Sequence, residues 1–209
     1  EPYGIRGIHF LDSGNYHYVT GIMTEQIKQE FSLILFDHHT DMQKPMIEDM
    51  TSCGDWAGKV LKTNPWLQQL ILIGPQEKDI QQIYSEKEGF VTCTELQEKL
   101  ITFSAEEIQS GEDERKISKI KKNFPVYISI DKDILDEAYS ETNWSQGKMS
   151  LPVLEQLLMP FLKNGNILGI DICGECQQGI PLPQYLEAEK VNGETNKELF
   201  DFLIHYSCK

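Results

Sequence analysis

The chain has 209 residues, of which 40% are hydrophobic and 25% are charged, so residues 1–209 have the size and composition of a single folded domain. Its 33 acidic and 19 basic residues give a net charge of −14, which excludes a protein built to neutralise nucleic-acid phosphates. No apolar run approaches the roughly 18 residues of a membrane span, so we expect no membrane partner either.

Short apolar runs recur along the chain, rich in Ile, Leu and Val and without polar residues in alternation. Such runs are typical of parallel strands that are buried on both faces of a sheet. They predict strands at Gly7–Leu11, Ser32–Phe36, Leu70–Ile73, Phe90–Cys93, Val126–Ile130 and Ile167–Ile172.

Segments with apolar residues at helical spacing separate most of these runs. Ser150 is a good N-cap for one of them, and Pro152 suits its first turn. The predicted helices are Tyr18–Phe31, Gly54–Leu61, Thr94–Thr102, Glu112–Lys122, Leu151–Leu162 and Asn192–Tyr206. The alternation of strand and helix predicts the α/β class, as a three-layer α/β/α sandwich around a mostly parallel sheet.

Acidic residues and histidines follow four of the predicted strands. His17 follows the first strand, and Asp37–Asp41 (DHHTD) follows the second. Asp131 and Asp133 follow the fifth, and Glu175 follows the last. Ligands of open α/β folds collect beyond the carboxyl ends of the strands, so we expect these side chains to face one common site.

The spacing within these segments predicts which side chains lie together. A segment that leaves a strand still alternates, so Asp37, His39 and Asp41 point one way. Asp131 and Asp133 are also two residues apart and share one side.

Such a cluster has the chemistry of a metal site. Four carboxylates in one place are electrostatically costly near neutral pH, and divalent cations remove that cost. Six N and O donors without a thiolate suit two Mn²⁺ ions, with Zn²⁺, Fe²⁺ and Co²⁺ as the alternatives. His38 points away from this site if the alternation holds, and we expect it to be a packed histidine.

Five cysteines are present, an odd number without the spacing of a disulfide scaffold, which favours a reducing compartment and a cytoplasmic protein. Cys173 and Cys176 form one C-x-x-C pair. A structural zinc site needs a second pair or added histidines, so we interpret these two cysteines as small residues at a strand end.

Three motifs resemble the signature of the arginase/agmatinase/formiminoglutamase superfamily, the ureohydrolases, whose deacetylase-like relatives share the fold. A D-x-H-x-D motif stands at Asp37–Asp41 and an S-x-D-x-D motif at Ser129–Asp133. The family's earlier G-G-D-H motif matches Gly14–His17. The resemblance covers roughly Gly7 to Glu175, and it implies a parallel sheet of eight strands where six are visible in this sequence.

The resemblance also implies a ligand set and a reaction. One metal ion would be held by His17, Asp37, Asp41 and Asp131, and the other by Asp37, His39, Asp131 and Asp133. A hydroxide bridging the two ions would attack the trigonal carbon of a small guanidino, amidino or amide substrate and cleave its C–N bond. Asp133 would hydrogen-bond this hydroxide and help to move its proton. The two metal ions are the only cofactors expected, and a homo-oligomer is consistent with the family.

Two positions depart from the family's pattern. The glutamate that binds the guanidinium lies in a D-x-x-E pattern, and Glu175 lies one residue further along after Asp171. Cys53 stands where the family has a proton-carrying histidine, and a thiol carries a proton only if its pKa is tuned. The candidate catalytic residues are therefore Asp133, Glu175 and Cys53, and the expected substrate is a small cation.

Two competing hypotheses stay open. A deacetylase-like amidohydrolase with one zinc ion needs a Tyr or His that hydrogen-bonds the oxyanion, and Tyr139 is the nearby candidate. A catalytically silent protein of the same fold would keep the metal-binding residues, and Cys53 in place of a histidine favours this reading mildly. Release of urea, ammonia or acetate distinguishes the three.

Overall fold

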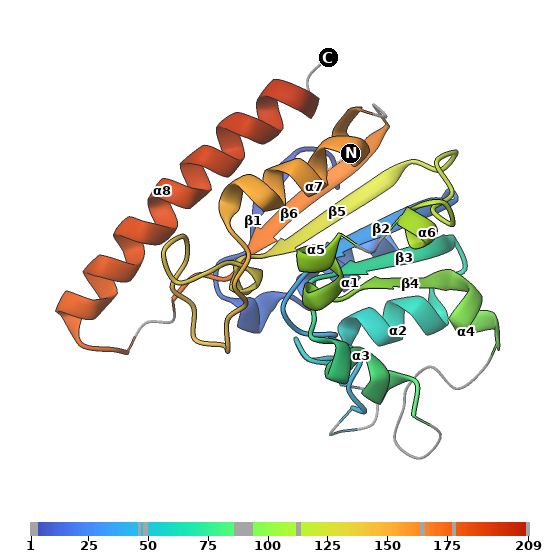
Figure 1. Ribbon diagram of the computed structural model, residues 1–209, viewed down its shortest axis with the longest axis horizontal. Coiled ribbons are helices and arrows are strands. Elements are labelled where there is room, and N and C mark those ends of the chain that lie inside the picture. The colour runs from blue at the N-terminus through green and yellow to red at the C-terminus, as the bar shows by residue number, and fades with distance from the viewer. Residues whose placement is uncertain are drawn as a thin grey trace.

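The computed structural model describes residues 4–45, 47, 50–85, 94–111, 114–163, 166–176 and 179–207. Its centre is a sheet of six parallel strands in the order β1-β6-β5-β2-β3-β4 (Figure 1). The strands are β1 (Ile8–Phe10), β2 (Phe31–Phe36), β3 (Leu67–Ile73), β4 (Leu100–Phe103), β5 (Val126–Asp131) and β6 (Ile167–Cys173). The predicted α/β class is confirmed, and each strand pair of this sheet is parallel.

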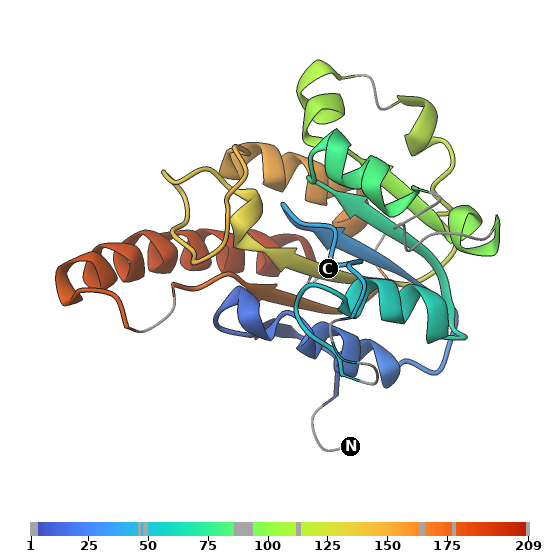
Figure 2. The same ribbon diagram turned by 90° about the horizontal axis from the view of Figure 1, so that it is seen from below.

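Helices cover both faces of the sheet, so the three-layer arrangement is also confirmed. α1 and α2 lie on one side of the sheet, and α5 and α7 lie on the other (Figure 2). The helices are α1 (Val19–Glu25), α2 (Trp56–Thr63), α3 (Glu77–Ile83), α4 (Thr94–Lys99), α5 (Ala105–Ser110), α6 (Glu114–Ile117), α7 (Leu151–Lys163) and α8 (Leu182–Ser207). Two 3-10 helices, η1 (Gly14–Tyr16) and η2 (Lys132–Ile134), follow β1 and β5.

The sheet separates two apolar cores. Leu33 and Leu35 of β2 point into the core that also contains Trp56 of α2. Ile34 and Phe36 point into the core on the opposite face. Because both faces of β2 are buried, a polar side chain on either face would lose its hydration, which is why the strand is a continuous apolar run.

One segment that is predicted to be helical forms a helix followed by a strand in the structure. The sequence predicts a helix over Thr94–Thr102, whereas α4 ends at Lys99 and β4 begins at Leu100. Leu100 is buried and pairs beside β3, and this tertiary pairing overrides the local helical spacing. The strand predicted at Phe90–Cys93 lies outside the described residues.

Two helices have other bounds than predicted. The predicted helix Tyr18–Phe31 stops at Glu25, because Phe31 is fully buried as the first residue of β2. The predicted helix Asn192–Tyr206 begins earlier, at Leu182, and its first part extends beyond the sheet (Figure 1). That part buries no continuous apolar face, so hydrophobic spacing does not reveal it. Among the described helices, none combines the length and apolar character that a bilayer span requires.

Three short helices also differ from the prediction. The helix predicted over Glu112–Lys122 is limited to Glu114–Ile117 in α6. Neither α3 nor α5 is predicted, although α5 begins with a capping box between Ser104 and Glu107. Helices of this size expose most of their residues and have too few turns for a periodic signal.

The strand directions explain where a site can form. Since all six strands point the same way, their carboxyl ends lie at one edge of the sheet. β2 and β5 are central neighbours, with Phe36 paired to Ile130. β6 lies beside β5 and pairs Cys173 with Asp131. The segments that follow these strands therefore meet.

Gly169 in β6 is a position where only hydrogen fits, since a Cβ there would collide with the Ile5 carbonyl oxygen and come within 2.9 Å of Tyr127 Cε2. We expect Gly169→Ala to lower the free energy of unfolding by about 1–3 kcal/mol or more, as overpacking does in cores. Gly193 of α8 is the matched control, because it is exposed and its Cβ would meet no atom within 4 Å. Gly193→Ala should stabilise by about 0.5–1 kcal/mol. Urea unfolding measures both, and equal stability of the two variants would contradict this packing.

Candidate metal centre

The segment after β2 brings three predicted ligands together. Asp37 extends the ladder, since its N–H donates to the carbonyl of Ile73 at 3.0 Å. Its Oδ1 accepts a 2.6 Å hydrogen bond from the backbone N–H of His39, which closes a tight turn. Asp41 adopts a left-handed φ of 49°, and its Oδ2 accepts a 2.6 Å hydrogen bond from Trp56 Nε1. These bonds aim the Asp37, His39 and Asp41 side chains at one point.

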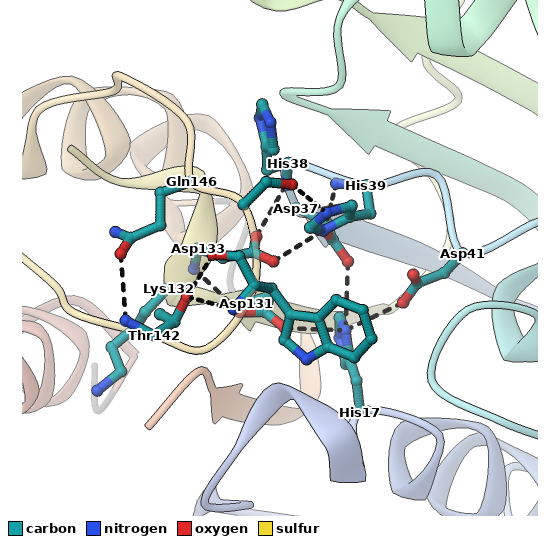
Figure 3. A network of polar contacts seen from close by, with 12 residues as sticks. His17, Asp37, His38, His39, Asp41, Asp131, Lys132, Asp133, Thr142 and Gln146 are labelled. Carbon is teal, nitrogen blue, oxygen red and sulfur yellow. Dashed lines mark hydrogen bonds and ion pairs between the residues drawn. The ribbon is translucent and has the colours of Figure 1, made fainter. Parts of the chain in front are cut away.

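The segment after β5 is held in a similar way. Asp131 ends the strand and caps η2, where its Oδ1 accepts from the N–H of Asp133 at 3.0 Å. Asp133 Oδ1 accepts from the backbone N–H of His38 at 3.1 Å, which joins this segment to the one after β2. The same arrangement recurs in Asp37, Asp131 and Asp133. In each, Oδ1 accepts a hydrogen bond from a backbone N–H, and Oδ2 points toward the histidine rings (Figure 3).

His17 lies at the start of α1 and presents Nδ1 to the carboxylates. Nδ1 is 3.2 Å from Oδ2 of both Asp37 and Asp41. Nε2 is 2.9 Å from Ser129 Oγ, which donates to Asp171 Oδ1 at 2.6 Å. Because the serine proton is given to Asp171, the serine oxygen accepts the Nε2 proton of His17. This contact orients the ring so that Nδ1 is the atom available to a metal.

His39 lies on the other side of the carboxylates. Its Nδ1 is 2.8 Å from Asp133 Oδ2 and 3.5 Å from Asp37 Oδ1. Its Nε2 is 2.9 Å from Ser145 Oγ, so a hydroxyl again lies on the far side of the ring. Asp37 therefore lies between the two histidines, within reach of both rings.

The six predicted ligands line one cavity of about 40 Å³, whose other lining residues are Gly14, Gln43, Cys53, Gly54 and Trp144. Gly14 permits a close approach, because a Cβ there would come within 2.9 Å of Asp131 Oδ2. A space of this size holds ions and a few water-sized groups. A larger cavity of about 640 Å³, on the face covered by α5 and α7, has no Asp, Glu, His or Cys among its lining residues. The residue types that line the smaller cavity, rather than its volume, therefore identify it as the candidate site.

The charges of the carboxylates depend on their neighbours, because all four are nearly excluded from water. Burial would raise the pKa of Asp37, but the adjacent histidine rings outweigh it and hold that pKa well below its usual value. Burial and the Asp37 charge raise the pKa of Asp41 to about 7. Burial and neighbouring carboxylates also raise the pKa of Asp131 and that of Asp133.

Burial acts on the histidines in the opposite direction, since it disfavours the charged imidazolium and lowers the pKa. Burial would lower the pKa of His39, but hydrogen bonds to Asp133 and Asp37 raise it to about 11. Burial is likewise outweighed at His17, whose pKa is raised well above its usual value by contacts with the buried acids around it, Asp37 and Asp41 among them. Without a metal, imidazolium groups balance the carboxylates. Metal binding needs neutral imidazole and ionised carboxylate, so a divalent cation would displace these protons.

Donor atoms in the cluster fit such cations. Asp37 Oδ2 is buried and has no hydrogen-bond donor in the described part of the chain, although His17 Nδ1 faces it at 3.2 Å. A buried oxygen without a partner is costly, and a cation would satisfy it. Two groups of three residues each offer ligand atoms that all lie within 4.8 Å of one another. The first group is His17, Asp37 and Asp41, and the second is Asp37, His39 and Asp133. Asp37 belongs to both groups, as a shared ligand would.

A third group of this kind contains His17, Asp131 and Cys173. Cys173 ends β6, and its Sγ donates to Asp131 Oδ2 at 3.1 Å. Burial and the Asp131 carboxylate raise the pKa of this thiol well above its usual value, so it is protonated in the metal-free protein. The expectation that Cys173 is only a small residue at a strand end does not include this contact, although the carboxyl end of that strand lies at the site.

The candidate catalytic residues Cys53 and Glu175 are placed differently. Cys53 is a half-buried part of the cavity wall, and burial together with the Asp41 charge raises the pKa of its thiol. Glu175 is not among the described residues that line the cavity. Its Oε1 accepts hydrogen bonds from Lys132 Nζ at 2.5 Å and Asn196 Nδ2 at 2.7 Å. Because Lys132 is fully buried, Glu175 compensates a charge inside the protein.

Two further side chains lie outside the cavity. His38 points away from the carboxylates, as the alternation predicts (Figure 3). It lines a separate hollow with Gly74 and Ile134. Tyr139 packs against the core that contains α7, and it is not among the described cavity residues.

Comparison with known proteins finds one family. The sequence model described as the Arginase family matches residues 15–174. An uncharacterized protein of Thermotoga maritima is 34% identical over 203 residues, which cover 96% of this chain and 70% of that protein.

Solved structures share the fold at low identity. The agmatine ureohydrolase of Thermoplasma volcanium superimposes with a TM-score of 0.69 at 15% identity, over 96% of this chain and 63% of that one. Formiminoglutamase of Trypanosoma cruzi with Mn²⁺ gives 0.68 at 12% identity, over 97% and 66%. Helicobacter pylori arginase gives 0.60 at 16% identity, over 90% and 71%. The chain thus spans less than two thirds of the first two of these solved chains.

The raised pKa of Asp41 predicts how pH affects the metal-free protein. A carboxyl whose folded pKa is raised contributes stability below its unfolded pKa of 3.8 and loses it as the pH rises through about 7. The melting temperature of the wild type should therefore fall from pH 4 to pH 7. The melting temperature of Asp41→Asn should fall less, because the asparagine side chain cannot ionise. Asp201→Asn, at an exposed site of α8, is the control and should follow the wild type. Equal pH slopes for Asp41→Asn and the wild type would refute this account.

Proposed function

The chain belongs to the Arginase family, and we propose that it is a dinuclear-metal hydrolase that cleaves a C–N bond of a small guanidino or amidino compound. One observation carries the proposal: two histidines and four aspartates from three different strand ends converge on a single cavity, and the four aspartates are buried. Such a set is too costly to be retained as a packing arrangement, because four carboxylates are removed from water together.

The donor set assigns the metal ions to particular residues. His17 Nδ1 with Asp41 and Asp131 would hold one ion, and His39 Nδ1 with Asp133 would hold the other, with Asp37 and Asp131 shared between them. Mn²⁺ is the proposed occupant on the grounds of nitrogen and oxygen donors, as in the formiminoglutamase that was solved with Mn²⁺. Bound ions of this kind supply a nucleophile from water at neutral pH and polarise the group under attack.

The protein's own residues orient the reaction. Asp133 Oδ2 faces the cavity beside His39, and we assign it the acceptance of the proton released from water. Trp144 lines the cavity with its indole Nε1 donating to Asn15 Oδ1 at 3.1 Å, and we assign it a part in limiting the entry of bulk water. Cys53 occupies the wall at the place of the family's proton-carrying histidine, and its role in proton transfer is part of the proposal.

The substrate is proposed to be a small cation. The chain's net charge of −14 attracts cations over long range. Glu175 contributes to this field, but its carboxylate already pairs with Lys132, so we assign it no direct contact with the substrate. Thiols at Cys53, Cys173 and Cys176, which form no disulfide, support a reducing compartment, and we propose the cytoplasm.

The two alternatives have less support. A deacetylase-like reaction requires an oxyanion donor at the metal, whereas Tyr139 is partly buried against the core and is not among the described cavity residues. A silent metal-binding protein remains consistent with Cys53, whose raised pKa keeps the thiol neutral. Turnover decides between this alternative and the proposal.

Metal loading tests the proposal. Purified protein stripped of metal and dialysed with Mn²⁺ should bind two ions per chain and release urea or ammonia from a panel of cationic, neutral and anionic amidines and amides. His39→Ala and Asp131→Asn should weaken metal binding by at least the roughly 10- to 100-fold that loss of an outer-sphere partner causes. Turnover by these variants should fall in parallel.

Asp136→Asn is the matched control, because Asp136 lies in the same segment and outside the described cavity residues. It should bind metal like the wild type. Absence of metal binding would refute the proposal, and two bound ions without turnover across the panel would favour the silent alternative.

A further inference from the structure

A buried thiol lies within the candidate centre, on the side of His17. Cys173 is 1% exposed, and its Sγ donates a 3.1 Å hydrogen bond to Asp131 Oδ2. That oxygen is in turn 3.4 Å from His17 Nδ1. The ligand atoms of these three residues lie within 4.8 Å of one another. Sulfur, oxygen and nitrogen donors therefore surround one point.

The backbone fixes Cys173 at this position. It is paired in register with Asp131 across β5 and β6, so the thiol and the carboxylate project from neighbouring strand ends. Gly174 follows with a left-handed φ of 98°, and a Cβ there would come within 2.6 Å of Asp131 Oδ1. The chain thus turns away immediately after the cysteine while leaving the thiol beside the carboxylate. Cys173 forms no disulfide with Cys176, so its thiol is available as a ligand.

Asp37 Oδ2, which is buried and accepts no hydrogen bond within the described part of the chain, is the second observation that points to a cation here. It lies 3.2 Å from His17 Nδ1, on the side of the ring that also faces Asp131 Oδ2. In the metal-free protein the Cys173 proton bridges sulfur and the Asp131 carboxylate. A cation that binds at this point replaces that proton as the partner of both atoms.

We propose that Cys173 Sγ is a metal ligand on the His17 side, so that this position prefers a thiophilic ion such as Zn²⁺ or Co²⁺. The His39 side offers only nitrogen and oxygen donors and would accept Mn²⁺. On binding, the S–H bond breaks, the proton passes to solvent and a sulfur–metal bond forms. This inference rests on the proposed dinuclear centre and adds that its two positions differ in metal preference.

Cobalt spectroscopy tests the ligand directly. The full chain, stripped of metal, is titrated with Co²⁺ under reducing conditions. Nitrogen and oxygen ligation gives weak visible d–d bands, whereas a thiolate ligand adds an intense near-ultraviolet charge-transfer band. The wild type should show both. Cys173→Ser should keep the d–d bands and lose the charge-transfer band.

Two other cysteines provide matched controls. Cys176→Ser alters the other member of the C-x-x-C pair, and Cys53→Ser alters the thiol in the cavity wall. Both should retain the charge-transfer band. Cys173→Ala serves beside the serine variant, and circular dichroism with thermal melting establishes that each variant is folded.

Competition gives an independent measure. At the His17 position, Zn²⁺ should displace Mn²⁺ from the wild type, and Cys173→Ser should reduce the ratio of Zn²⁺ to Mn²⁺ affinity by at least tenfold. Visible d–d bands without a charge-transfer band in the wild type would overturn the inference and leave the dinuclear centre intact. Persistence of the band in Cys173→Ser, or its loss in Cys53→Ser alone, would also overturn it. Absence of any Co²⁺ binding would refute the centre itself.

Discussion

Four aspartates share one cavity at the carboxyl ends of β2 and β5, and their mutual repulsion is the constraint around which the site is arranged. Water cannot screen them, since Asp37, Asp41, Asp131 and Asp133 are each at most 6% exposed. In the metal-free chain the compensation comes from protonated histidines and from raised carboxyl pKa values. Both forms of compensation disappear when a divalent cation binds. The centre is therefore destabilising by itself and would become favourable with a bound metal, as is common for sites that serve function rather than stability.

The surrounding scaffold keeps the carboxylates aimed despite this repulsion. The backbone N–H groups of His38, His39 and Asp133 each donate a hydrogen bond to one carboxylate oxygen. These bonds prevent the carboxylates from rotating away from one another. Behind His17, Ser129 and Tyr127 both donate to Asp171, and this buried network fixes the orientation of the ring. On the other side of β5, Lys132 and Glu175 form a partly buried ion pair. That pair engages Glu175, the residue that the family resemblance makes the candidate for the guanidinium-binding glutamate, so its carboxylate is already paired inside the protein.

The sequence predicts which side chains converge on the cavity, because that information is local. Apolar runs locate the strand ends, and a spacing of two residues places Asp37, His39 and Asp41 on one side. The order of strands in the sheet is not local, so the sequence places Cys173 at a strand end but does not say that β6 lies beside β5 and brings this thiol to Asp131. The partnership of Lys132 with Glu175 is hidden for the same reason. The apolar spacing predicts a helix that overlaps most of β4, because Leu100–Phe103 gains its strand conformation from pairing with β3.

The central claim is that two metal ions lie between His17 and His39 and share Asp37. Anomalous diffraction from crystals grown with Mn²⁺ and recorded at the manganese absorption edge tests it most directly. The account predicts two peaks in the cavity, one bonded to His17 Nδ1 and the other to His39 Nδ1, with Asp37 contacting both. A single peak, or peaks only at surface carboxylates, would contradict it.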